Sequence, residues 1–130
     1  MNYLLVVNFA SSVTQTLGLE RSCYTIGRFK RCDVVVPKKF DFVSRIHLTF
    51  IRGEKHGKNY CLLMDGAFYP RKISSNGAWV NGVKIDDSIE LNHQDEITFS
   101  SVEKMPKIVF LVEEKLQEIE DTWTHEKEAC

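Results

Sequence analysis

The sequence is divided into about ten short segments that are rich in β-branched and aromatic residues or alternate apolar with polar residues. Glycine, proline or small polar residues separate them, which is typical of strands joined by turns. The expected strands are residues 3–9, 13–19, 21–26, 34–36, 47–52, 60–64, 78–80, 83–85, 97–99 and 107–112. Ten short strands with turn signals every eight to twelve residues suit two packed sheets and need no crossover helices. We therefore predict an all-β fold, a two-sheet antiparallel β-sandwich.

Two of the connections have the composition of hairpin turns. The dipeptide Asn81-Gly82 lies between two expected strands, and both residues tolerate the positive φ angles of a type I′ turn. The segment Gly53–Gly57 lies between two others and predicts a second hairpin.

The composition fits one globular domain. The chain has 130 residues, of which 43% are hydrophobic and 27% charged, so it is too apolar to be disordered. Its formal net charge of -1 gives no bulk positive field, so we expect neither nucleic acid nor an anionic membrane as a partner. No apolar run approaches the ~20 residues of a membrane helix, and the first residues lack the basic start of a secretory signal. We therefore expect a cytoplasmic location.

The four cysteines are widely spaced and form no C-x-x-C motif, which argues against a zinc site or a redox pair. We expect Cys23, Cys32, Cys61 and Cys130 to be free, buried thiols that behave as small hydrophobic residues. The sequence therefore predicts no metal and no cofactor.

The composition changes after Val112, which divides the chain into a domain (residues 1–112) and an acidic C-terminal tail (113–130). The tail carries seven acids and two lysines, a net charge of -5, which leaves 15 basic and 11 acidic residues in the domain, a net charge of +4. Its apolar residues Leu116, Ile119 and Trp123 follow helical spacing, so a helix could form on a surface. We expect the tail to dock on its own domain or on a second copy, giving a homodimer; a disordered extension is the alternative.

The excess positive charge of the domain is concentrated between Arg28 and Arg45. This segment contains six basic and two acidic residues and has the glycine and proline of a loop region. The cluster predicts either an anion-binding loop or a solvated basic face.

Four short motifs stand in a fixed order along the domain: Gly27-Arg28, Ser44-Arg45-Ile46-His47, Ser74-Ser75-Asn76-Gly77 and Val80-Asn81-Gly82. In this order, across residues 3–112, the chain resembles the forkhead-associated (FHA) domain. The resemblance implies an eleven-stranded β-sandwich that is not an enzyme. It also implies that loops at one end bind phosphothreonine peptides of partner proteins after a Ser/Thr kinase has acted on them.

The resemblance also implies a role for each matched residue. Arg28 would reach the phosphate with its fork of donors, and Ser44 and Ser75 would add hydroxyl contacts. Asn76 would hold the peptide main chain with its amide. Arg45 and Lys30 flank these positions and would contact phosphate or acidic peptide side chains. The residues expected to shape the loops without touching the ligand are Gly27, His47, Gly77, Asn81 and Gly82.

The sequence departs from the family pattern in a few places. Ala78 replaces the usual threonine, and Gln94 stands where glycine commonly precedes Asp95. The stretch 66–72 is longer than in the shortest family members and would extend the peptide-facing surface. Phe42 lies in a different loop, the one that in this family usually selects the residue three positions after the phosphothreonine, and it favours an apolar residue there.

Two other functions are open to such a sequence. The first is a phosphate-independent interaction or scaffold domain that uses the sandwich surface or the tail, and the intact binding motifs argue against it. The second is a hydrolase with Ser44 as nucleophile and His47 as base, which lacks an orienting third residue and a G-x-S-x-G elbow.

Overall fold

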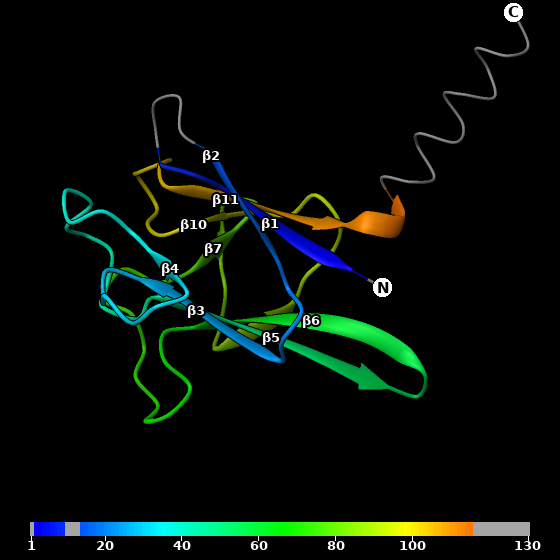
Figure 1. The fold of residues 1–130 in the computed structure, drawn as a ribbon. Helices are drawn as coiled ribbons and strands as arrows, with labels where there is room; N and C mark the ends of the chain where they lie inside the picture. The colour runs from blue at the N-terminus through cyan, green and yellow to red at the C-terminus, as the bar shows by residue number, and fades with distance from the viewer. Residues whose placement is uncertain (1, 10–13, 116–130) are drawn as a thin grey trace, which may run out of the picture.

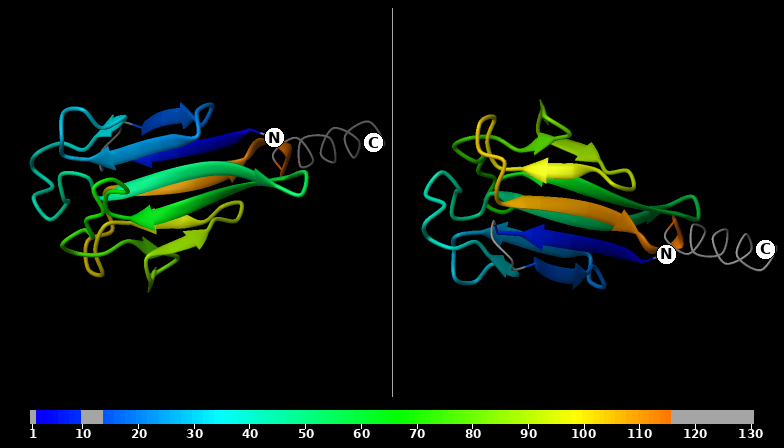
Figure 2. Two further views of the ribbon diagram at one scale, coloured as in Figure 1. Left: turned by 90° about the horizontal axis from the view of Figure 1, so that it is seen from below. Right: turned by 90° about the horizontal axis from the view of Figure 1, so that it is seen from above.

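The computed structural model describes residues 2–9 and 14–115, which form eleven strands in two packed sheets (Figures 1 and 2). In spatial order, the six-stranded sheet contains β2 (Thr14–Gly18), β1 (Tyr3–Asn8), β11 (Lys107–Val112), β10 (Glu96–Thr98), β7 (Trp79–Val80) and β8 (Val83–Lys84). The five-stranded sheet contains β4 (Val34–Val35), β3 (Cys23–Gly27), β5 (Leu48–Lys55), β6 (Lys58–Asp65) and β9 (Ser88–Glu90). The predicted all-β sandwich is confirmed.

The core lies between the two sheets and follows from the alternating pattern of the strands. In β1 and β11 every second residue is buried, which sends one set of side chains inward. The largest fully buried side chains are Phe50 of the five-stranded sheet, Phe110 of the six-stranded sheet and Phe99, which directly follows β10. Burial of a phenylalanine is worth roughly 1.5–3 kcal/mol, so these residues hold the two sheets together.

The strand pattern differs from the sequence prediction in three details. The pairing of β3 with β4 is parallel, in an otherwise antiparallel fold. The hairpin of β5 and β6 is longer than predicted, because His56 and Gly57 alone make its turn, with φ angles of 53° and 77°. Strand β9 was missed because its three residues, two of them exposed, carry no apolar alternation.

The described cysteines differ in their burial. Cys23 is exposed and Cys32 and Cys61 are buried, and all three are free. The expectation of a buried thiol is therefore wrong for Cys23, and Cys130 lies outside the described residues. Burial raises the pKa of Cys61 to about 12, which keeps this thiol protonated.

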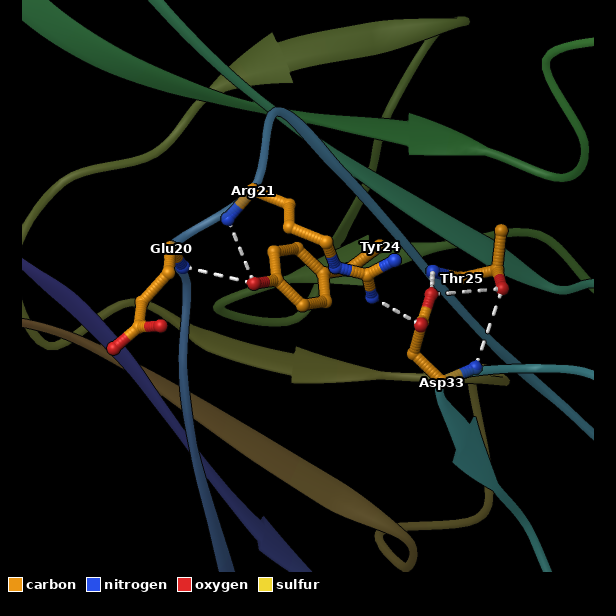
Figure 3. Close-up of polar contacts among 5 residues, drawn as sticks. All are labelled: Glu20, Arg21, Tyr24, Thr25 and Asp33. Carbon is orange, nitrogen blue, oxygen red and sulfur yellow. Dashed lines mark hydrogen bonds and ion pairs between the residues drawn. The ribbon is translucent and has the colours of Figure 1, made fainter.

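A polar cluster ties the start of β3 to the end of the β3–β4 loop (Figure 3). The hydroxyl oxygen of Tyr24 accepts hydrogen bonds of 2.8 Å from the backbone N–H groups of Glu20 and Arg21. The Arg21 guanidinium lies 4.4 Å from the centroid of the Tyr24 ring and forms an ion pair with Asp33. The Asp33 carboxylate also accepts the backbone N–H of Thr25 at 2.8 Å, so the loop returns to the strand it left.

The loops that follow β3, β4 and β6 gather at one end of the sandwich, whereas β11 ends beside the N-terminus at the opposite end (Figures 1 and 2). Residues 113–115 are helical, and the rest of the tail, with Leu116, Ile119 and Trp123, lies outside the described residues. The predictions for the tail therefore stay predictions.

Candidate functional site

Arg28 is held at the point where β3 ends. Its backbone N–H donates to the carbonyl of Ser44 at 3.2 Å, and its Nε donates to the carbonyl of Val43. Neither Nη group has a hydrogen-bond partner among the described residues, so both remain available to a ligand. Gly27 allows this approach of two loops, because a Cβ there would lie 2.1 Å from the carbonyl oxygen of Arg45.

His47 joins the β4–β5 and β6–β7 loops from beneath. Its imidazole is fully buried, and its Nδ1 accepts the backbone N–H of Ser44 at 2.9 Å. The proton therefore sits on Nε2, which donates to the carbonyl of Gly77 at 2.7 Å. Burial lowers the pKa of His47, because the charged form would lose solvation and the acceptor for Ser44.

Ser44 and Asn76 connect the same two loops at the surface. The Ser44 Oγ accepts the backbone N–H of Ser75 at 2.9 Å and keeps its own hydroxyl proton for another acceptor. The Asn76 Nδ2 donates to the carbonyl of Phe42 at 2.6 Å, while its side-chain oxygen has no partner among the described residues. Ser75 is itself exposed.

Ser74 and Asp65 form a buried pair beneath this surface that the sequence analysis did not assign. The hydroxyl of Ser74 donates to the Asp65 carboxylate and accepts the backbone N–H of Gly77 at 3.0 Å. Gly77 has a φ of 83°, which suits glycine and turns the chain after Asn76. The only sequence signal for this pair was an aspartate at the end of an expected strand, and the sequence did not show which of several nearby hydroxyl residues would bind it.

The β3–β4, β4–β5 and β6–β7 loops surround a pocket of about 410 Å³. Its charged and polar lining consists of Arg28, Arg45, Lys72, Ser44 and Ser75, and its apolar lining of Phe29, Ile46, Ala67, Tyr69, Pro70 and Ile73. Three cations and no acid line this pocket, so it is electropositive. The sequence placed Lys72 only within a long loop, because charge alone does not reveal which lysine of a loop lines a pocket.

The predicted site residues divide into those that line the pocket and those that do not. Arg28, Ser44, Arg45 and Ser75 line the pocket, whereas Asn76 does not. Lys30 is exposed on the β3–β4 loop and also does not line it. The expected roles of these residues remain predictions.

The Asn81-Gly82 turn lies in the β7–β8 hairpin and makes no contribution to the pocket lining. Asn81 and Gly82 have φ angles of 51° and 82°, as a type I′ turn requires. The Asn81 side chain donates to Asp95 at 2.9 Å and accepts the backbone N–H of Glu96 at 2.9 Å. These bonds tie the hairpin to β10.

The described part of the chain meets the requirements of neither of two other kinds of site, a metal site and a membrane-spanning helix. No group of three or more His, Cys, Asp or Glu side chains within residues 2–9 and 14–115 could hold a metal ion. None of the helical residues that the structure describes forms a segment long and apolar enough to cross a membrane.

Known proteins resemble this chain in sequence or in fold. An uncharacterised Synechocystis protein, sll1895, is 36% identical over 101 residues, which are 77% of this chain and 14% of that protein. Yeast Pml1p superimposes with a TM-score of 0.70 and 27% identity over 85% of this chain and 81% of its own. A domain from a structural and functional analysis of phosphothreonine-dependent FHA domain interactions has a TM-score of 0.62 and 22% identity, covering 86% and 97%.

The family comparison gives the assignment directly. Residues 24–100 match the sequence model described as the FHA domain, a range that contains all four motifs and the whole pocket. The fold, the order of the motifs and this match agree, and the chain therefore belongs to the FHA domain family.

Proposed function

We propose that this chain binds phosphothreonine-containing segments of partner proteins and thereby recruits those partners after phosphorylation. The phosphate occupies the pocket at Arg28, Ser44 and Ser75. The observation that carries the proposal is that Arg28, whose Nη groups have no hydrogen-bond partner among the described residues, lines the same pocket as Ser44 and Ser75. A phosphate brings about -1.5 to -2 charges and three acceptor oxygens, which matches this donor set.

The peptide main chain lies beside Asn76. This amide donates one hydrogen to Phe42, so its second hydrogen and its oxygen can pair with the extended backbone of a peptide. The resemblance of this chain to a domain with phosphothreonine-dependent interactions supports threonine as the modified residue. A γ-methyl group buried beside the phosphate contributes about 0.8 kcal/mol over phosphoserine.

The expected affinity follows from the donor count. Each charge-assisted hydrogen bond contributes a net ~1.5–3 kcal/mol. Three or four such bonds, less the cost of ordering the peptide and the loops, correspond to a Kd on the order of 0.1–100 μM. Binding of this strength is reversible and suits signalling.

The proposed role is binding without catalysis. The Ser44 hydroxyl is engaged by the backbone N–H of Ser75, and the Nδ1 of His47 is engaged by the backbone N–H of Ser44. The other ring nitrogen points to the Gly77 carbonyl. His47 is therefore not positioned to take a proton from Ser44, and it serves as the link between two binding loops.

A phosphothreonine peptide library, read out on the purified chain, tests the proposal and supplies a ligand. The best peptide is then titrated by calorimetry in its phosphorylated and unphosphorylated forms. The proposal expects micromolar binding of the first and at least a 50-fold weaker interaction with the second. Equal affinities for the two forms would refute it.

A further inference from the structure

The pocket is larger than one phosphate needs. Pockets of about 300–1,000 Å³ accommodate whole small molecules, and this one, at about 410 Å³, lies within that range. Arg28, Ser44 and Ser75 provide the donors for a single phosphate. Lys72 and Arg45 line the same pocket in addition to that set.

Lys72 is held in place by the backbone of its loop. Gly66 has a φ of 81°, and a Cβ on it would lie 1.9 Å from the carbonyl oxygen of Lys72, so the chain crosses itself closely here. Ala67 and Lys72 exchange backbone hydrogen bonds of 2.7 and 3.1 Å, which close the small loop between them. The backbone that carries the Lys72 ammonium is therefore fixed relative to the pocket.

The neighbouring cation is used differently. Arg71 forms an ion pair of 2.6 Å with Asp87 and donates to the carbonyls of Asp65 and Ala67, at 2.5 and 2.9 Å. The Arg71 guanidinium is thus already paired within the protein, where it anchors the loop. Lys72, the next residue, has no ion-pair or hydrogen-bond partner for its ammonium among the described residues.

Arg45 approaches the pocket from the β4–β5 loop. Its guanidinium lies 4.6 Å from the centroid of the Phe29 ring, which orients the group without neutralising it. The ion pairs among the described residues join Arg21 to Asp33, Arg71 to Asp87 and Lys107 to Glu96. Neither Arg45 nor Lys72 takes part in one, so the pocket keeps two cations beyond the proposed phosphate donor.

An apolar occupant fits this lining less well than an anion. Tyr69 and Ile73 line the pocket and are 92% and 64% exposed, so an apolar side chain could contact them. Such a side chain would also displace water from two cations without replacing the lost interactions, which costs free energy. A carboxylate or phosphate supplies acceptors for both cations.

We infer that the ligand carries a second anionic side chain close to the phosphothreonine, and that Lys72 and Arg45 bind it. The inference rests on the proposed function, because it extends the same site. Side chains two positions apart in an extended peptide lie on one face, about 7 Å apart, which suits two anions in one continuous pocket. A glutamate, an aspartate or a second phosphorylated residue supplies the chemistry.

Matched peptides on the full chain test this inference. Each contains one phosphothreonine and alanine flanks, and it is compared with versions that carry glutamate or phosphoserine two positions before or two positions after. We expect glutamate on one side only to tighten binding about 3- to 10-fold at constant salt, and phosphoserine there to tighten it more.

Two variants separate the local effect from general charge. Lys72→Gln removes the charge and keeps an unbranched polar side chain that is one atom shorter, so it should abolish most of the affinity difference between acidic and alanine-flanked peptides. Lys58→Gln makes the same change in the β5–β6 hairpin, which lies at the other end of the sandwich (Figure 1), and should keep this difference. A thermal melt of each variant confirms its fold.

The outcomes are distinct. Equal binding of acidic and alanine-flanked peptides, a preference that persists in Lys72→Gln, or a gain from an apolar residue instead of an acid would each overturn the inference and leave the proposed function standing. Failure of every phosphothreonine peptide in the set, the acidic ones included, to bind more tightly than its unphosphorylated form would overturn both.

Discussion

The buried imidazole of His47 makes the stability of this domain sensitive to pH just below neutrality. Burial lowers its pKa below the ordinary value of 6.5, which the unfolded chain keeps. As the pH falls below 6.5, the unfolded chain takes up a proton that the folded chain resists, so acid favours unfolding. The contribution of neutral His47 to the free energy of unfolding is therefore complete above pH 6.5 and is lost as the pH falls toward the pKa of His47 in the folded chain.

The magnitude has a ceiling set by one proton. One pKa unit corresponds to about 1.4 kcal/mol, so His47 contributes a slope of up to about 1.4 kcal/mol per pH unit below 6.5. His47→Gln removes the titration and retains an amide that can donate to Gly77. It leaves the buried N–H of Ser44 without its acceptor, at a cost of about 1–3 kcal/mol at pH 7.5.

Urea unfolding of both proteins at pH 7.5, 6.5 and 5.5 measures the two effects together. We expect the variant to be less stable at pH 7.5 and the gap to narrow as the pH falls, because only the wild type loses the His47 contribution. The remaining histidines are common to both proteins and cancel. A gap that stays constant or widens toward pH 5.5 would contradict a neutral, buried His47.

Three further substitutions or ligand changes have expected outcomes. Gly27→Ala places a Cβ 2.1 Å from a backbone carbonyl oxygen, so thermal or urea unfolding should show a loss of about 3 kcal/mol or more; an unchanged midpoint would be inconsistent with the close approach. Gln94→Gly should raise stability by roughly 0.5–1 kcal/mol, because Gln94 has a φ of 72°, and a lower midpoint would speak against strain there. A phosphothreonine peptide should bind about fourfold more tightly than its phosphoserine twin in calorimetry, the equivalent of one buried methyl group, and identical affinities would remove the threonine preference.

The fold was largely predictable because strand identity is a local property. Alternation in β1 and β11 and the Asn81-Gly82 turn determine where the chain extends and reverses. The parallel pairing of β3 with β4 was not predictable, since Val34 and Val35 form only two residues of strand and their partner is chosen by the Asp33 cluster. Strand β9 pairs with β6 at the edge of a sheet. This pairing, and not a local pattern of apolar residues, makes its three residues a strand, so the sequence did not predict it.

The site was predictable only in part, because it joins loops that are distant along the chain. The family motifs indicated Arg28, Ser44 and Ser75, and the pocket contains all three. Lys72 and the buried Ser74–Asp65 pair could be placed only from the path of the β6–β7 loop. That path depends on Gly66 and on the contacts of Arg71. Such positions have no signature in the spacing of residues.

Calorimetric titration of a phosphothreonine peptide into Arg28 variants tests phosphate recognition at this pocket most directly. Arg28→Ala should weaken binding by about 2–4 kcal/mol, which is roughly 30- to 1,000-fold, because its guanidinium–phosphate contact has no substitute. Arg28→Lys should recover part of the loss through its charge, and Lys58→Ala, at the far end of the sandwich, should bind like the wild type. Wild-type affinity in a folded Arg28→Ala variant would contradict the assignment of the phosphate to this pocket.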